Sequence, residues 1–146
     1  MAPTKRILLV DDNRKDVELV LDALSEHELS QSTTVVRDGA DALDYLYHRG
    51  RFADTAKELP DLVLLDLKMP KVDGLEVLRQ IKSDPELRRI PVVMMSSSRE
   101  QMDLSRSYDS GVNSYVVKPI SFQKFLETIS RVGLYWILAN ESPPDA

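Results

Sequence analysis

The sequence contains no cysteine among its 146 residues, which excludes disulfide scaffolds, thiolate metal sites and cysteine nucleophiles. Long hydrophobic runs are also missing near the N-terminus. The first apolar stretch, Ile7 to Val10, is too short for a signal peptide or a membrane span. Together these absences favour a protein of the reducing cytoplasm with no membrane partner.

No block of Lys and Arg stands out, since 24 acidic and 19 basic residues are spread along the chain to give a net charge of -5. Nucleic acid is therefore not an expected partner. The length suits one domain over residues 1–146, with no room for a separate output domain. Within it we expect a helical C-terminal extension at about 132–141 and a frayed tail, SPPDA, at 142–146.

Short apolar runs rich in Val, Ile and Leu recur without strict alternation, which is typical of strands buried on both faces. They are KRILLVDD, TTVVRD, PDLVLLDL, IPVVMM and NSYVVKP. Between them, helical spacing predicts helices whose buried faces carry Val17, Val20, Leu21 and Leu24, then Ala42, Leu43, Leu46 and Tyr47, then Leu75, Leu78 and Ile81. A weaker pattern predicts a helix over 98–110, and a strong one predicts a helix from about 121. This alternation indicates an α/β fold with a doubly wound parallel sheet.

Polar residues follow four of the predicted strands directly: Asp11 and Asp12, Asp66, Ser96, and Lys118. Ligands of such sheets bind beyond the carboxyl ends of the strands, so these side chains should converge. Three neighbouring carboxylates repel one another unless one takes up a proton or a cation lies among them. With no histidine or thiolate nearby, Mg²⁺ is the expected ion, and Mn²⁺ could replace it. Asp12 and Asp66 are the expected direct ligands, with Asp11 acting through water.

Each of these residues has an ordinary structural interpretation when taken alone. An Asp after a strand is often a helix N-cap, a serine often bonds its own turn, and a lysine is usually a solvated surface residue. The ordered set, in which each residue type directly follows its own strand, is what indicates a functional site.

The chain resembles the receiver domain of two-component response regulators over nearly its whole length. The matching motifs are VDD at Val10 to Asp12, DLKMPKVDG at Asp66 to Gly74, SS at Ser96 and Ser97, and KP at Lys118 and Pro119. The resemblance implies a flavodoxin-like (βα)5 fold with strand order 2-1-3-4-5.

By the same resemblance, Asp66 is the phosphoacceptor, and Asp11, Asp12 and the backbone carbonyl of Lys68 complete the Mg²⁺ site. Ser96 is then the switch hydroxyl and Lys118 the phosphate-binding lysine. Tyr115 is the switch aromatic, although an ordinary strand tyrosine is an equal alternative. Pro119 is a candidate cis proline, against the alternative of a trans loop residue. The family usually has threonine where this chain has Ser96. The Lys68 side chain could either reach the phosphoryl group or block the attacking water, so the lifetime of the phosphorylated state does not follow from the resemblance.

The phosphoryl donor is expected to be a sensor histidine kinase, because His27 and His48 are predicted to lie away from the strand ends. The insert at residues 49–60 and the aromatic C-terminal extension are similar to response regulators that partner phytochrome-type kinases. The insert could equally be a surface loop without a role.

The run Val132 to Leu138, VGLYWIL, is apolar on nearly every side of its helix. Leu134, Tyr135 and Leu138 are left facing outward, which favours a homodimer. The alternative is a hydrophobic cap packed back on the domain.

Three other functions compete with the receiver interpretation. A phosphatase of the haloacid dehalogenase type needs an acid two residues after its nucleophile, where this chain has Lys68. A flavodoxin-like cofactor binder needs a glycine- and hydroxyl-rich loop, where this chain has DDNRKD. A phosphorylation-independent docking module of the same fold is the more serious alternative. We therefore expect a phosphorelay protein rather than a conventional enzyme, with self-phosphorylation and autodephosphorylation as its only chemistry.

Overall fold

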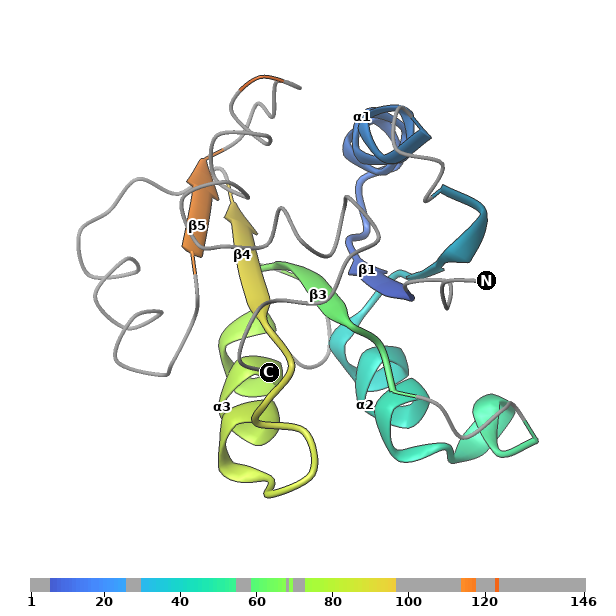
Figure 1. Ribbon diagram of the computed structural model, residues 1–146, viewed down its shortest axis with the longest axis vertical. Helices are drawn as coiled ribbons and strands as arrows, with labels where there is room; N and C mark the ends of the chain where they lie inside the picture. Colours follow the sequence, from blue (N-terminus) through green and yellow to red (C-terminus); the bar gives the residue numbers. More distant parts are fainter. Residues whose placement is uncertain are drawn as a thin grey trace, which may run out of the picture.

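The computed structural model describes residues 6–25, 30–54, 59–67, 69, 73–96, 114–117 and 123. Within them, strands and helices alternate along the chain (Figure 1). In chain order they are β1 Ile7–Val10, α1 Arg14–Ser25, the 3₁₀ helix η1 Ser30–Ser32, β2 Thr33–Val36, α2 Gly39–Tyr47, the 3₁₀ helix η2 Gly50–Phe52, β3 Leu62–Asp66, α3 Gly74–Ser83, β4 Val92–Ser96 and β5 Ser114–Val117.

The strands form one parallel sheet in the order β2-β1-β3-β4-β5. Sequence order is broken between β2 and β3, where β1 lies between them, so the chain winds in both directions from the first strand. This confirms the predicted α/β fold and the strand order 2-1-3-4-5.

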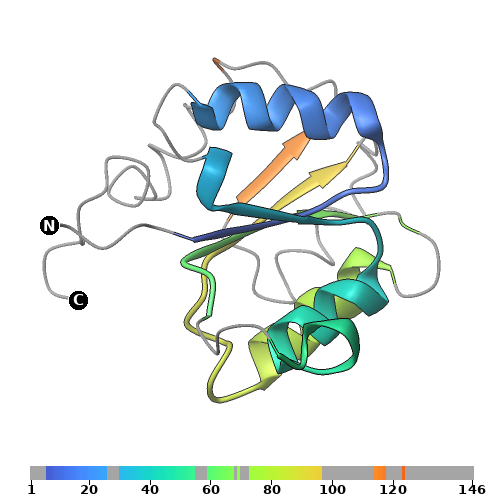
Figure 2. The same ribbon diagram turned by 90° about the vertical axis from the view of Figure 1, so that its right-hand side faces the viewer.

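Helices cover both faces of the sheet, with α1 on one face and α2 and α3 together on the other (Figure 2). Successive strand residues point to opposite faces. Leu9 and Leu64 accordingly belong to the core cluster that includes α1, and Leu8 and Val63 to the cluster that includes α2 and α3. Every residue of β1 and β3 is buried, which explains why these strands show no polar alternation. The edge strand β2 differs, because three of its four residues are only half-buried.

The predicted helix faces are largely confirmed, with one correction on α2. Ala42, Leu43 and Leu46 are buried, but Tyr47, which was expected on the same face, is 37% exposed. Its hydroxyl hydrogen-bonds with Asp84, the C-cap residue of α3, so a polar partner holds the ring at the surface.

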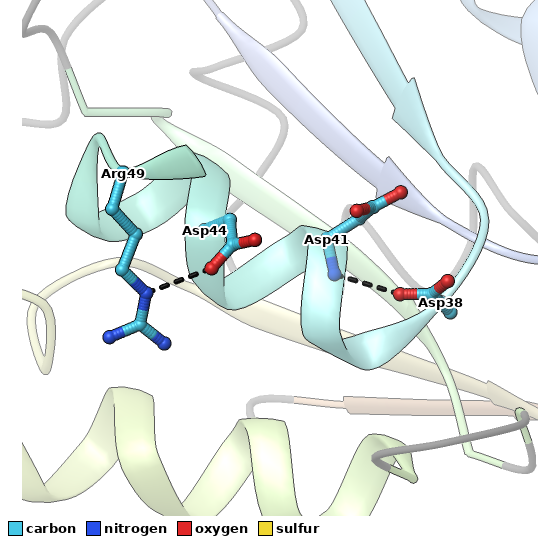
Figure 3. A network of polar contacts seen from close by, with 4 residues as sticks. All are labelled: Asp38, Asp41, Asp44 and Arg49. Atoms are coloured by element: carbon cyan, nitrogen blue, oxygen red, sulfur yellow. Dashed lines mark hydrogen bonds and ion pairs between the residues drawn. The ribbon is translucent and has the colours of Figure 1, made fainter. Parts of the chain in front are cut away.

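The chain reverses direction after α2 and packs the start of the insert against that helix. His48 and Gly50 both have left-handed backbone conformations, at φ 53° and 60°. Arg49 Nε then donates to Asp44 Oδ1 at 2.8 Å, one turn back on α2, while Asp38 Oδ1 accepts from the Asp41 amide at 2.8 Å to cap the start of the helix (Figure 3). The first part of the insert is therefore held in place.

Several predictions fall outside the described residues. They are the helix over 98–110, the helix from about 121, the extension at 132–141 and the tail at 142–146. Among the helices that the structure does describe, none has the length and apolar character needed to cross a membrane.

Candidate functional site

The register of the sheet brings the predicted site residues to one edge. Val10 pairs with Leu65, so Asp11 and Asp66 follow at the same level on adjacent strands. Asp66 pairs with Met95, and Ser96 pairs with Val117. The ends of β1, β3, β4 and β5 therefore form one continuous edge, as the sequence predicted.

Three carboxylates meet at this edge. Asp11, Asp12 and Asp66 each offer one oxygen, and these oxygens all lie within 4.8 Å of one another. Asp11 is 0% and Asp66 5% exposed, whereas Asp12 faces solvent. Two carboxylates of the group are thus buried and the third is open to solvent, so a small ligand can reach the group from outside.

The loop after β1 fixes Asp11 through two hydrogen bonds. Its backbone amide donates to the Val36 carbonyl at 3.1 Å, which extends the pairing with β2. Its Oδ1 accepts from the Asn13 amide at 2.9 Å. This short side-chain to backbone bond turns the chain, so that Asp12 projects outward between two anchored neighbours.

Asn13 caps α1, which settles the alternative role considered for the two aspartates. The Asn13 side-chain oxygen accepts from the Asp16 amide at 3.1 Å, directly before the first residue of the helix. The N-cap position is therefore filled by Asn13 rather than by Asp11 or Asp12. Asn13 was not among the predicted residues, although an Asn three residues before an acidic residue at the start of an apolar helical pattern is a capping signal.

Asp66 ends β3, and the chain around it is tied to the sheet and to α3. The Leu67 amide donates to the Met95 carbonyl at 3.0 Å, which continues the register with β4 by one residue. The Gly74 amide donates to the Leu67 carbonyl at 2.7 Å and closes the intervening loop at its base. The acceptor strand and the start of α3 are therefore joined directly behind Asp66.

The remaining predicted residues are described only in part. Ser96 and Tyr115 have their backbones in β4 and β5, where Tyr115 pairs with Met94. Lys118 follows the last residue of β5 in the chain. Five predicted residues, together with this lysine, lie outside the described residues: Lys68, Pro119, Leu134, Tyr135 and Leu138.

The donor set suits a hard divalent cation. All three groups are carboxylates, and carboxylate oxygen is what Mg²⁺, Ca²⁺ and Mn²⁺ prefer. Like charges this close repel each other, more strongly because two of them are shielded from water. His48 lies beyond the end of α2, which starts after β2 and returns to the opposite end of the sheet. An imidazole ligand or phosphoryl carrier is thus absent from the described part of this edge.

Comparison with known proteins agrees with this geometry. A family model for the response regulator receiver domain matches residues 7–130. Among curated proteins, the "Probable methanogenesis regulatory protein FilR2" of Methanothrix harundinacea is 44% identical over 141 residues, covering 96% of this chain and 88% of FilR2.

Solved structures of response regulators superpose closely. The bacteriophytochrome response regulator RtBRR is 51% identical, with a TM-score of 0.83 over 97% of this chain and 86% of that one. The phosphorylated cyanobacterial phytochrome response regulator RcpA is 40% identical, with a TM-score of 0.81 over 98% and 100%. The Mn²⁺-bound form of the response regulator Rcp1 is 35% identical, with a TM-score of 0.79 over 96% and 99%.

These matches cover almost the whole chain and agree with its fold. Receiver domains bind a divalent metal ion, take part in two-component signalling with a histidine kinase, and are not conventional enzymes. The chain belongs to the response regulator receiver domain family.

Proposed function

We propose that Asp66 accepts a phosphoryl group from a sensor histidine kinase in a Mg²⁺-dependent reaction. The observation that carries this proposal is the meeting of Asp11, Asp12 and Asp66 within 4.8 Å at the ends of β1 and β3. Asp11, Asp12, Asp66 and the backbone carbonyl of Lys68 would hold the ion. When bound, Mg²⁺ supplies positive charge beside the oxygens of the transferring group.

The acceptor step needs a carboxylate held in line with the phosphorus. An oxygen of Asp66 attacks phosphorus and forms an acyl phosphate, while the phosphorus–nitrogen bond of a donor phosphohistidine breaks. The imidazole nitrogen keeps the electron pair and takes a proton from solvent. Asp66 suits this role because its backbone is fixed by the sheet and only 5% of the residue is exposed.

Residues of the neighbouring strands complete the proposed chemistry. Lys118 pairs with a phosphoryl oxygen, and the Ser96 hydroxyl donates a hydrogen bond to another. Movement of Ser96 toward the phosphoryl group lets Tyr115 turn inward, which passes the signal to the surface beside β4 and β5. The pairing of Ser96 with Val117, one residue before Lys118, supports this grouping.

We also infer that the partner kinase is of the phytochrome type. RtBRR and RcpA are phytochrome response regulators by name, and RtBRR has the highest sequence identity to this chain among the four relatives described above. The name of FilR2 states a different role, in the regulation of methanogenesis, and its identity to this chain is lower than that of RtBRR. The similarity extends over nearly the full chain in each case, so the higher identity to RtBRR favours a light-sensing kinase.

A homodimer formed through Leu134, Tyr135 and Leu138 is the third part of the proposal. It rests on the run Val132 to Leu138, which is apolar on more sides than one domain core can cover. Light scattering should give the mass of two chains. A monomer mass that stays constant with concentration, for both the phosphorylated and the unphosphorylated protein, would contradict the dimer.

The phosphoacceptor is tested by intact-protein mass after incubation with Mg²⁺ and acetyl phosphate or phosphoramidate. Wild type should gain one phosphoryl group that hydroxylamine removes, and Asp66→Asn should gain none. Asp22→Asn, an exposed substitution on α1, is the matched control and should label like wild type. Labelling of Asp66→Asn at the wild-type level would overturn the assignment. A folded, metal-binding wild type that takes no label would favour the phosphorylation-independent docking module.

A further inference from the structure

Gly74 lies against the backbone of Asp66 with no room for a side chain. A Cβ atom built on Gly74 would clash with the carbonyl oxygen of Asp66, and would lie 2.8 Å from Leu67 Cα and 2.9 Å from the Asp66 carbonyl carbon. Real Cβ atoms essentially never approach other heavy atoms this closely. All three obstacles are backbone atoms, which cannot move aside as the end of a flexible side chain can.

Helix propensity alone predicts the opposite preference at this position. Gly74 is the first residue of α3, where alanine would normally be the better helix former. The backbone of Gly74 has no left-handed conformation that would require glycine, since the positive φ angles among the described residues are those of His48 and Gly50. The requirement for glycine therefore comes from the close approach to Asp66.

Two hydrogen bonds hold Gly74 in this position. Its amide donates to the Leu67 carbonyl at 2.7 Å, and Asp73 caps the helix by accepting from the Glu76 amide at 3.0 Å. Leu67 is in turn bonded to Met95 on β4. The start of α3 is thus fixed to the same peptide units that orient the Asp66 carboxylate.

We propose that Gly74 is a positioning residue for Asp66, setting the place of its carboxylate relative to Asp11 and Asp12. The inference rests on the proposed function of the acidic cluster. Any side chain at Gly74 must push α3 away or displace the Asp66–Leu67 backbone. Ligands of Mg²⁺ and Mn²⁺ must meet strict distances, so a small displacement of Asp66 separates it from a common ion.

The test compares Gly74→Ala with Gly50→Ala, and its first readout is Mn²⁺ affinity by equilibrium dialysis. Gly50 is a matched control because it begins η2, its φ is 60°, and its Cβ would lie 3.1 Å from Asp44 Oδ2, away from the acidic edge. Gly74→Ala should lose at least about tenfold in Mn²⁺ affinity, as is typical when a residue that orients a metal ligand is changed. Gly50→Ala should stay within about twofold of wild type, since it touches no ligand or ligand support.

The second readout is the rate of hydroxylamine-sensitive phosphorylation by phosphoramidate, with folding followed by circular dichroism. Gly74→Ala should be phosphorylated more slowly than Gly50→Ala when the two are compared at equal folded fraction. Equal Mn²⁺ affinities and equal rates in the two variants would overturn the positioning role. A wild type that binds Mn²⁺ but takes no phosphoryl group would instead overturn the proposed function.

Asp73 provides a second pair of variants that adds no atoms, in case Gly74→Ala does not fold. Asp73→Ala removes the cap of α3, and Asp73→Asn keeps a capping oxygen while removing the charge. Asp73→Ala should weaken Mn²⁺ binding by about two- to fivefold, because loss of a typical N-cap changes the equilibrium of helix formation by roughly fivefold and this is the most that can reach the metal site. Asp73→Asn should bind like wild type. Equal affinities of Asp73→Ala and wild type, or equal losses in both variants, would contradict the inference.

Discussion

At the scale of single residues, the hydroxyl of Tyr47 links the two helices that cover one face of the sheet. It hydrogen-bonds with Asp84 from the end of α2. Burial raises the pKa of Tyr47 above its ordinary value, and the hydrogen bond to Asp84 and the charge of that carboxylate raise it further. Arg49, whose Cζ lies 5.1 Å from the ring centre, acts in the opposite direction. The folded protein therefore favours the neutral phenol.

Tyr47→Phe should remove this link while keeping the ring. We expect a loss of about 0.5 kcal/mol in the free energy of unfolding at pH 7, because a partly exposed hydrogen bond contributes little. The unfolded chain ionises its tyrosines at about pH 10, before folded Tyr47 does, so wild type should lose this contribution as the pH rises above about 10. Urea unfolding of both proteins from pH 8 to 11 measures the difference, which should shrink toward high pH. A difference that is constant over this range would contradict the assignment.

The acidic residues of the site could be predicted from sequence because each directly follows a strand. Once the parallel sheet is inferred, Asp11, Asp12 and Asp66 must share an edge, whatever the side chains around them do. Gly74 entered the sequence-based prediction only as the last residue of the motif DLKMPKVDG. Its contact with Asp66 depends on how closely α3 approaches the sheet, and spacing along the chain carries no information about that distance.

At the scale of elements, the start of the insert packs against α2 through specific side-chain contacts. The Phe52 ring lies edge-on to Tyr45 of α2, with ring centres 5.3 Å apart. Arg51 stacks over Phe52 with its Cζ 4.6 Å from the ring centre, and its Nη2 donates to Asp41 at 3.0 Å. These contacts extend the α2 surface by one short helix at the end of the sheet opposite the acidic cluster.

Sequence patterns predicted the elements well where burial was uniform and less well where it was mixed. The apolar runs of β1 and β3 are buried on both faces, and their lack of alternation correctly indicated parallel strands. Tyr47 was placed on the buried face because helical spacing treats its ring as apolar. The polar partner that keeps it at the surface comes from α3, 37 positions further along, at Asp84.

The connection from α3 to β4 shows how a charged side chain can serve an element. Lys82 Nζ donates to the carbonyls of Arg88 at 3.2 Å and Ile90 at 2.8 Å. Burial lowers the pKa of this lysine, because removing the charged ammonium group from water costs free energy. The two hydrogen bonds offset that cost and fix the turn that leads into β4, the strand that ends at Ser96.

At the scale of the whole molecule, folding concentrates negative charge that the unfolded chain keeps apart. The net charge is -5, and three carboxylates are gathered at one edge with two of them shielded from water. Their repulsion opposes folding, and a cation bound among them favours it. The stability of the native state should therefore depend on divalent ions beyond the general effect of salt.

Mg²⁺ should raise the melting temperature of wild type by about 5–10 °C at a concentration one hundred times its dissociation constant. This shift follows from about 2.7 kcal/mol of linked stabilisation and the usual response of a domain of this size. Asp66→Asn removes one of the repelling charges, so without metal it should melt above wild type. It also removes a ligand, so its Mg²⁺-induced shift should be much smaller.

Asp22→Asn is the matched control for the loss of one carboxylate, because Asp22 is exposed in the last turns of α1, away from the strand ends. It should keep the wild-type response to Mg²⁺. The melts are compared with KCl at equal ionic strength, because general screening acts on all surface charges alike. If Asp66→Asn and Asp22→Asn gain the same stability from Mg²⁺, the ion acts on surface charge in general, and the three carboxylates do not form a common site. A gain that Asp66→Asn alone loses shows that folding builds the metal site and that the metal in turn stabilises the fold.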